Sequence, residues 1–130
     1  MSTLPDAMAQ YMERMGIARE RLRNGRLTLH VDDRHRVVVA PLPGGEALLE
    51  ARVGPLPEDP VQHEQAIERA MRLACARMAE DAASLVLDEA GRALLLQRRV
   101  AAGATVFDFE QALESHLNAL AGWKGALAGA

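Results

Sequence analysis

The amino-acid sequence predicts an α+β protein with elements in the order α-β-β-β-α-β-β-α. Two observations predict this class. Strand-like apolar runs occupy residues 26–53 and 85–100, and apolar residues at helical spacing precede, separate and follow these runs. Within each strand region the connections are short and polar or rich in glycine, which is typical of antiparallel neighbours. We therefore expect an antiparallel five-stranded sheet packed with three helices.

The length and composition predict one globular domain over residues 1–130, with 49% apolar and 25% charged residues. A net charge of −3 and an aromatic content of 3% argue against nucleic-acid binding. No apolar run approaches the ~20 residues that cross a membrane, and the N-terminus lacks the pattern of a secretory signal. The single cysteine, Cys75, suits a reducing compartment. We expect a cytoplasmic protein without membrane insertion.

The first helix is predicted from about Leu4 to Arg23, where Asn24-Gly25 is expected to end it. Gly16 lowers the helix propensity inside this segment and marks a candidate bend. The apolar residues that recur at steps of three and four are Leu4, Met8, Tyr11, Met15, Ala18 and Leu22.

Three strands are predicted next, over residues 26–31, 36–42 and 46–53. In the third strand Leu48 lies out of phase with the inward-facing residues, so it is expected on the outer face. A hairpin follows at residues 85–100, and Gly91 in its turn is free to adopt positive φ. The residues expected to face inward from the third strand are Ala47, Leu49, Ala51 and Val53.

Two further helices are predicted, one before the hairpin and one after it. Asp59 before Pro60 is a suitable N-cap for a helix over residues 60–81. Asp108 and Gln111 have the spacing of a capping box at the start of the last helix. Its buried stripe is expected to contain Leu113, Leu117, Leu120, Trp123 and Leu127.

Residues with the chemistry of an active site are few. His30, Asp32, Asp33 and His35 resemble metal ligands. A catalytic metal site needs three ligands that converge on one point and an open position, and no further His/Glu pair in the sequence is placed to complete such a set. Cys75 has no neighbouring base and is expected to be a buried, inert thiol. The sequence therefore predicts no enzymatic activity, no cofactor and no metal, with a small enzyme or metal protein that uses His30, Asp32 and His35 as a rival interpretation.

Three segments, in this order and at this spacing, resemble the class I chaperones of bacterial type III secretion, the Tir-chaperone (CesT-like) family. The likeness extends from about Met8 to Leu127. The chain departs from the family pattern at Asn24-Gly25 and at Asp32-Asp33, which leaves the bound substrate open. The three segments are Val53-Gly54-Pro55-Leu56-Pro57, Leu85 to Gly91, and Leu113-Glu114-x-x-Leu117 leading to Trp123-Lys124-x-x-Leu127.

The resemblance implies a secretion-chaperone-like fold and a cytosolic homodimer. Such a dimer binds the N-terminal segment of a secreted effector and keeps it soluble and export-competent; the secretion-apparatus ATPase is a further implied partner. The alternative is an adaptor or regulator on the same scaffold that binds a folded partner protein.

The implied dimer interface lies on the second helix and a neighbouring strand, although the same helix face would otherwise cover the sheet of its own subunit. Methionine adapts to varied partners, so methionines of the first helix are candidate effector contacts. The predicted interface residues are Ile67, Met71, Ala74, Cys75, Met78 and Val86. The predicted effector-binding residues are Met8, Met12, Met15, Leu48, Leu94 and Leu96.

Overall fold

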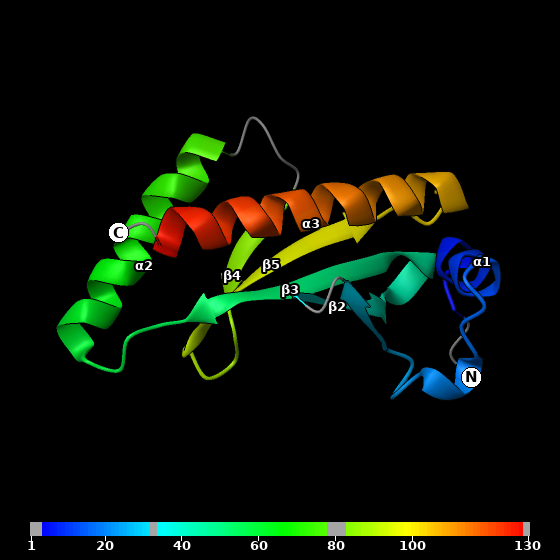
Figure 1. Ribbon diagram of the computed structural model, residues 1–130, viewed down its shortest axis with the longest axis horizontal. Helices are drawn as coiled ribbons and strands as arrows, with labels where there is room; N and C mark the ends of the chain where they lie inside the picture. Colours follow the sequence, from blue (N-terminus) through cyan, green and yellow to red (C-terminus); the bar gives the residue numbers. More distant parts are fainter. Residues whose placement is uncertain (1–3, 32–33, 78–82, 129–130) are drawn as a thin grey trace.

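The computed structural model describes residues 4–31, 34–77 and 83–128. It confirms the predicted fold class, with five antiparallel strands and three helices in the expected order (Figure 1). Two short 3₁₀ turns, Arg19–Arg21 and Pro43–Gly45, lie between these elements. The elements are α1 (Asp6–Arg14), β1 (Leu27–Val31), β2 (His35–Pro41), β3 (Ala47–Pro55), α2 (Pro60–Arg77), β4 (Ser84–Leu87), β5 (Ala93–Val100) and α3 (Val106–Ala128).

The sheet has the strand order β1-β2-β3-β5-β4, and every neighbouring pair is antiparallel. Its inner face buries alternate residues of the central strands, as the sequence of the third strand predicts. Leu49 and Leu96 are completely buried there. Between Arg52 and Gly54 the register with β5 shifts, so β3 changes its pairing phase near its end.

Helix α3 covers the inner face of the sheet (Figure 1), where it packs against β3 and β5. Phe109, Leu113, Leu120 and Trp123 are buried at the spacing of one helix face. The capping box lies one turn earlier than predicted: the Thr105 hydroxyl accepts from the Asp108 amide, and the Asp108 carboxylate accepts from the Thr105 amide.

Helix α1 is shorter than its apolar pattern predicts, because Gly16 ends it. Gly16 has φ +68°. The Gly16 amide donates to Glu13 O and the Ile17 amide donates to Met12 O, which is the Schellman pair of bonds. Ile17 and Leu22 still pack against the core from the irregular chain beyond the helix.

The sequence predicted that Asn24-Gly25 ends the first helix. In the structure these two residues instead form the turn that leads into β1. Both residues have positive φ, and Arg23 and Arg26 exchange two backbone hydrogen bonds across them. This is a two-residue hairpin loop of the type that favours Asn-Gly.

The start of α2 and the turn of the second hairpin are built as the sequence predicts. The Asp59 carboxylate accepts from the Gln62 amide and caps α2. Gly91 has φ +68° and its amide donates to Asp88 O. The predicted end of α2 at residue 81 lies outside the described residues.

Candidate partner-binding surfaces

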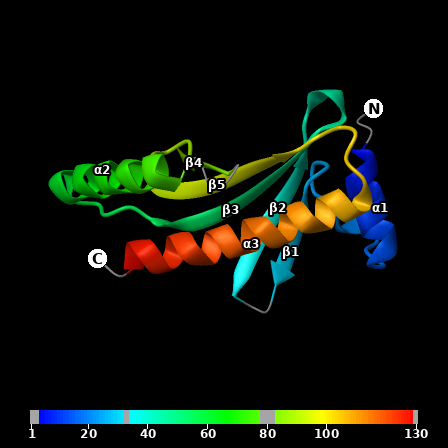
Figure 2. The same ribbon diagram turned by 90° about the horizontal axis from the view of Figure 1, so that it is seen from above.

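Helix α2 projects beyond the sheet rather than covering it, at the end where α3 finishes (Figures 1 and 2). Of its 18 residues only Ala70 is buried. The side chains of Val61 and Met71 are each 63% exposed. An amphipathic helix with one buried residue leaves an apolar surface that its own subunit does not use.

Besides apolar packing around Ala70, three contacts through polar or charged side chains of the described residues attach α2 to the rest of the subunit. The Arg77 guanidinium lies 5.0 Å from the centre of the Trp123 ring. Arg69 donates to the carbonyl of Ala126 at 2.8 Å. His63 Nε2 lies 2.8 Å from Gly91 O in the second hairpin, so this nitrogen carries the proton. These contacts use one side of the helix.

The predicted interface residues occupy both the edge of this contact side and the exposed side. Ile67 and Ala74 are half-buried and pack against the core, and Val86 is half-buried on β4. Met71 and Cys75 are exposed. The prediction that the Cys75 thiol is buried is therefore wrong. Met78 lies outside the described residues. The interface itself stays a prediction.

The methionines of α1 are mostly core residues. Met8 and Met12 are 0% and 2% exposed, and only Met15 presents its side chain to solvent. The ring of Tyr11 packs 4.9 Å from that of Phe109 of α3. Burial, reinforced by the negative charge of Glu110, raises the pKa of Tyr11 above its usual value of 10.0. A fully buried methionine offers a partner no surface in this conformation.

Strand β5 divides its three consecutive leucines between the two faces of the sheet. Leu94 and Leu96, which the sequence analysis assigned to effector binding, point to the inner face and are buried. Leu95 faces outward and is half-buried, as is Leu48 on β3. The register of β5 with β3 sets this phase, which an uninterrupted leucine run does not reveal.

The outer face of the sheet carries apolar residues at both ends and a polar pair between them. Leu48 lies opposite Ala40 of β2, and Leu95 lies opposite Val86 of β4. Between these groups Gln97 donates to the Glu50 carboxylate at 2.7 Å. Helix α3 crosses the other side of the twisted sheet (Figure 2). The outer face is therefore a second surface with half-exposed apolar residues.

A shallow hollow of about 670 Å³ lies where α1 begins, beside the loop between β2 and β3. Its walls are largely apolar, and Asp6 is the one charged residue among them. The sequence analysis did not identify it, although Pro-Leu-Pro-Gly-Gly marks a rigid, exposed loop. The lining residues are Leu4, Asp6, Pro41, Leu42, Pro43, Gly44, Gly45 and Ala102.

Among residues 4–31, 34–77 and 83–128, no group of three or more His, Cys, Asp or Glu side chains is placed to hold a metal ion. His30 and His35 flank the turn between β1 and β2, and Asp32 and Asp33 of the proposed cluster lie outside the described residues. Within the described part of the chain, no helix is long and apolar enough to span a bilayer.

The subunit therefore combines one sheet, covered on one face and half-exposed on the other, with an outlying amphipathic helix, and both leave apolar surface that its own core does not cover. The sequence profile of the Tir chaperone protein (CesT) family matches residues 7–124. The chain belongs to this family. A sequence search of curated proteins found no match.

Solved structures share the fold at low sequence identity. A chain of the HopA1–SchA chaperone–effector complex aligns with a TM-score of 0.69 and 14% identity, over 94% of this chain and 91% of that chain. A chain of the ExsC–ExsE complex aligns with a TM-score of 0.62 and 21% identity, over 93% of this chain and 90% of that chain. A chain of the ExoU–SpcU complex of the type III secretion system of Pseudomonas aeruginosa aligns with a TM-score of 0.64 and 20% identity, over 91% of this chain and 92% of that chain.

Proposed function

We propose that this family member is a cytoplasmic, non-enzymatic chaperone of type III secretion that binds the N-terminal segment of a secreted effector. The observation that carries the proposal is the amount of amphipathic surface that the subunit leaves uncovered on α2 and on the outer sheet face. The chaperone–effector complexes that share the fold support it. Delivery of the loaded chaperone to the secretion ATPase belongs to the same proposal and rests on the family resemblance alone.

The proposed active form is a homodimer joined through α2. The exposed side chains of Met71 and Cys75 lie four residues apart, about one helical turn, so a second copy would cover both at once. A twofold axis that passes beside α2 places the same apolar surface of each subunit against its copy. This arrangement would remove from water the α2 side that the subunit's own sheet does not contact.

Effector capture would proceed without covalent chemistry. Apolar side chains of an extended effector segment would displace water from Leu48, Met15 and the hollow beside α1. Burial contributes about 25 cal/mol per Å² of apolar surface, and ordering the segment offsets part of this gain. The same contacts would shield the effector's apolar residues from aggregation until export.

The experiment that tests the function starts from the native host. A tagged chain is isolated without crosslinking under secretion-inducing conditions, and its partners are identified by mass spectrometry. We expect one secreted protein to be enriched, and its N-terminal fragment alone to bind the purified chaperone. Recovery of folded cytoplasmic proteins only, with no binding to an N-terminal segment, would instead favour the adaptor.

The effector-binding surface is then tested at Met15, which is exposed, and at Leu48, which is half-buried on the outer sheet face. Met15→Asp and Leu48→Asp together should weaken binding of the effector fragment about tenfold or more, because each places a charge where an apolar contact is expected. Val61→Asp is the control for Met15→Asp, since Val61 is 63% exposed and Met15 57%, but Val61 lies in the first turn of α2. Unchanged affinity in the double variant would exclude these two positions from the binding surface.

A further inference from the structure

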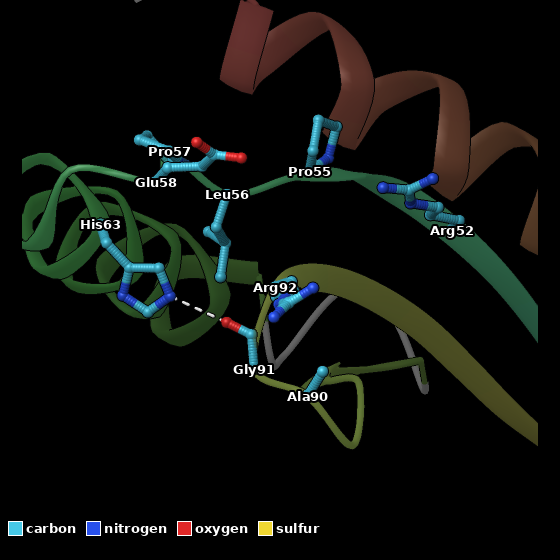
Figure 3. Close-up of a pocket in the computed structure, with 9 residues that line it drawn as sticks. All are labelled: Arg52, Pro55, Leu56, Pro57, Glu58, His63, Ala90, Gly91 and Arg92. Atoms are coloured by element: carbon cyan, nitrogen blue, oxygen red, sulfur yellow. Dashed lines mark hydrogen bonds between the residues drawn. The ribbon is translucent and has the colours of Figure 1, made fainter.

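The end of β3 lies between two hollows that share Arg52 and Pro55. The first, of about 510 Å³, opens between the β3–α2 loop and the β4–β5 turn (Figure 3). The second, of about 550 Å³, extends over β2 and β3 toward α3. The two hollows adjoin at these shared residues, where β3 leaves the sheet, and are together called the basic groove.

The basic groove gathers positive charge in a protein whose net charge is −3. Among the described residues that line it, five are basic and two, Glu50 and Glu58, are acidic. Glu50 already accepts a hydrogen bond from Gln97. The basic residues are Arg34, Arg36, Arg52, Arg92 and Lys124.

Within the described part of the chain, none of these five basic side chains forms an ion pair or a side-chain hydrogen bond. Three described glutamates, Glu46, Glu68 and Glu110, pair instead with Arg99, Arg72 and Arg14, which lie outside the groove. Several like charges held side by side repel one another, and an anionic ligand relieves that repulsion.

The wall that carries Arg92 is fixed by its backbone. The Arg92 amide donates to the Asp88 carboxylate at 2.8 Å, and its carbonyl accepts from the amide of Leu56, which is buried. His63 of α2 contacts the neighbouring carbonyl of Gly91 (Figure 3). Because the loop and the turn are tied together, a ligand would not have to order them on binding.

We propose that the basic groove binds an acidic, extended peptide segment of the partner protein. This inference rests on the proposed function for the identity of the partner, and adds a charged recognition site to the apolar surfaces above. Arginine pairs with carboxylates through two parallel hydrogen bonds, so side chains of Asp and Glu are the groups that Arg52 and Arg92 suit best.

The lining favours a peptide over other polyanions. Its described residues include no Phe, Tyr or Trp ring on which a base of a single-stranded nucleic acid would stack, and the one imidazole, that of His63, is held against Gly91 O. The exposed large apolar residues of the described chain, Met15, Val61, Met71, Leu87 and Phe107, all lie outside it, so it lacks the apolar wedge with which a peripheral protein enters a membrane.

The test uses a fluorescent ten-residue peptide in which Glu alternates with Ser, and a neutral peptide with Gln in place of Glu. We expect the acidic peptide alone to bind, with an affinity that falls as salt is raised. Arg52→Glu and Arg92→Glu together should weaken its binding at least about tenfold. Both side chains are exposed, so the double variant should keep the circular-dichroism spectrum and melting temperature of a folded protein.

The matched control carries Arg19→Glu and Arg21→Glu, two exposed arginines outside the basic groove with the same change in net charge. Equal weakening by the control pair would overturn the proposal, because the effect would then report overall charge. Equal binding of the neutral peptide, or binding of single-stranded RNA or anionic vesicles in place of the acidic peptide, would overturn it as well.

The effector fragment separates this inference from the proposed function. If the fragment binds the wild-type chaperone and the Arg52→Glu, Arg92→Glu variant equally well, the basic groove proposal fails and the chaperone proposal stands. If no secreted protein binds at all while the acidic peptide still requires Arg52 and Arg92, the chaperone proposal fails and the groove stands.

Discussion

Helices α2 and α3 are both long and amphipathic, yet the subunit uses them in opposite ways. In α3 the apolar stripe faces the sheet, and Phe109 and Leu120 are completely buried. In α2 one residue of 18 is buried, and the helix lies beyond the sheet (Figure 1). The difference shows that an apolar stripe indicates that a helix has a partner without indicating whether that partner belongs to the same chain.

The largest expected effect separates the two helices by stability. Phe109→Ala should lower the free energy of unfolding by about 3–5 kcal/mol, because it leaves a cavity against Tyr11 and the sheet. Val61→Ala on the exposed side of α2 should change it by less than about 0.5 kcal/mol. Urea unfolding followed by circular dichroism measures both. Similar losses in the two variants would mean that α2 belongs to the subunit core.

The second prediction tests what covers α2. Met71→Arg should convert a dimer into a monomer of 14.1 kDa, because an arginine in an apolar interface has no partner for its charge. Light scattering coupled to size-exclusion chromatography gives the mass.

Val61→Arg is the control for this prediction, because it adds the same side chain at an equally exposed site on α2. A wild-type mass of one chain, or a dimer that survives Met71→Arg, would place the partner of α2 elsewhere. Equal dissociation by Val61→Arg would mean that the whole exposed side of the helix is covered.

The sequence predicted the order of elements and the inner face of the sheet, because strand alternation and helical spacing are local properties. It overestimated α1 for a physical reason. Apolar residues continue at helical spacing to Leu22, but Gly16 adopts positive φ and the later residues reach the core from irregular backbone. The helical spacing of the apolar residues therefore predicted that Leu22 packs against the core, but not that the backbone beyond Gly16 is irregular.

The candidate sites were harder to predict, because spacing does not distinguish a subunit's own core from a partner's surface. Met8 and Met15 belong to the same predicted stripe and Met12 lies beside it, yet only Met15 is exposed. Among Leu94, Leu95 and Leu96, the outward residue depends on pairing with β3, which is 40 or more positions away in the sequence. The basic groove assembles residues from β2, β3, α2, β5 and α3 and from the loops between strands and helices, so it has no local signature.

A smaller effect is expected at the contact between the two helices. Arg77→Ala removes the guanidinium from the face of Trp123 and should lower the free energy of unfolding by about 0.5–1 kcal/mol, with a shift in the fluorescence of this only tryptophan. Arg72→Ala on the same helix is the control, because its ion pair with Glu68 is exposed. Unchanged tryptophan emission in Arg77→Ala would argue that α2 is not held against α3 in solution.

The smallest effect concerns the side of α3 that α1 covers, and it appears only in alkali. The pKa of Tyr11 is raised, so the folded protein keeps the phenolic proton to higher pH than the unfolded chain does. The stability that this represents is present below about pH 10 and is lost as pH rises through the raised pKa. Tyr11→Phe keeps the ring against Phe109 without an ionisable group, so its free energy of unfolding should fall less between about pH 9 and 11. Arg77→Ala should retain the full alkaline loss, because it disturbs α2 and leaves the contact between α1 and α3 intact. If the free energy of unfolding falls equally with pH in wild type and Tyr11→Phe, Tyr11 is solvated. In that case α3 is packed less tightly against α1 than the structure indicates, and it differs less from the loosely attached α2.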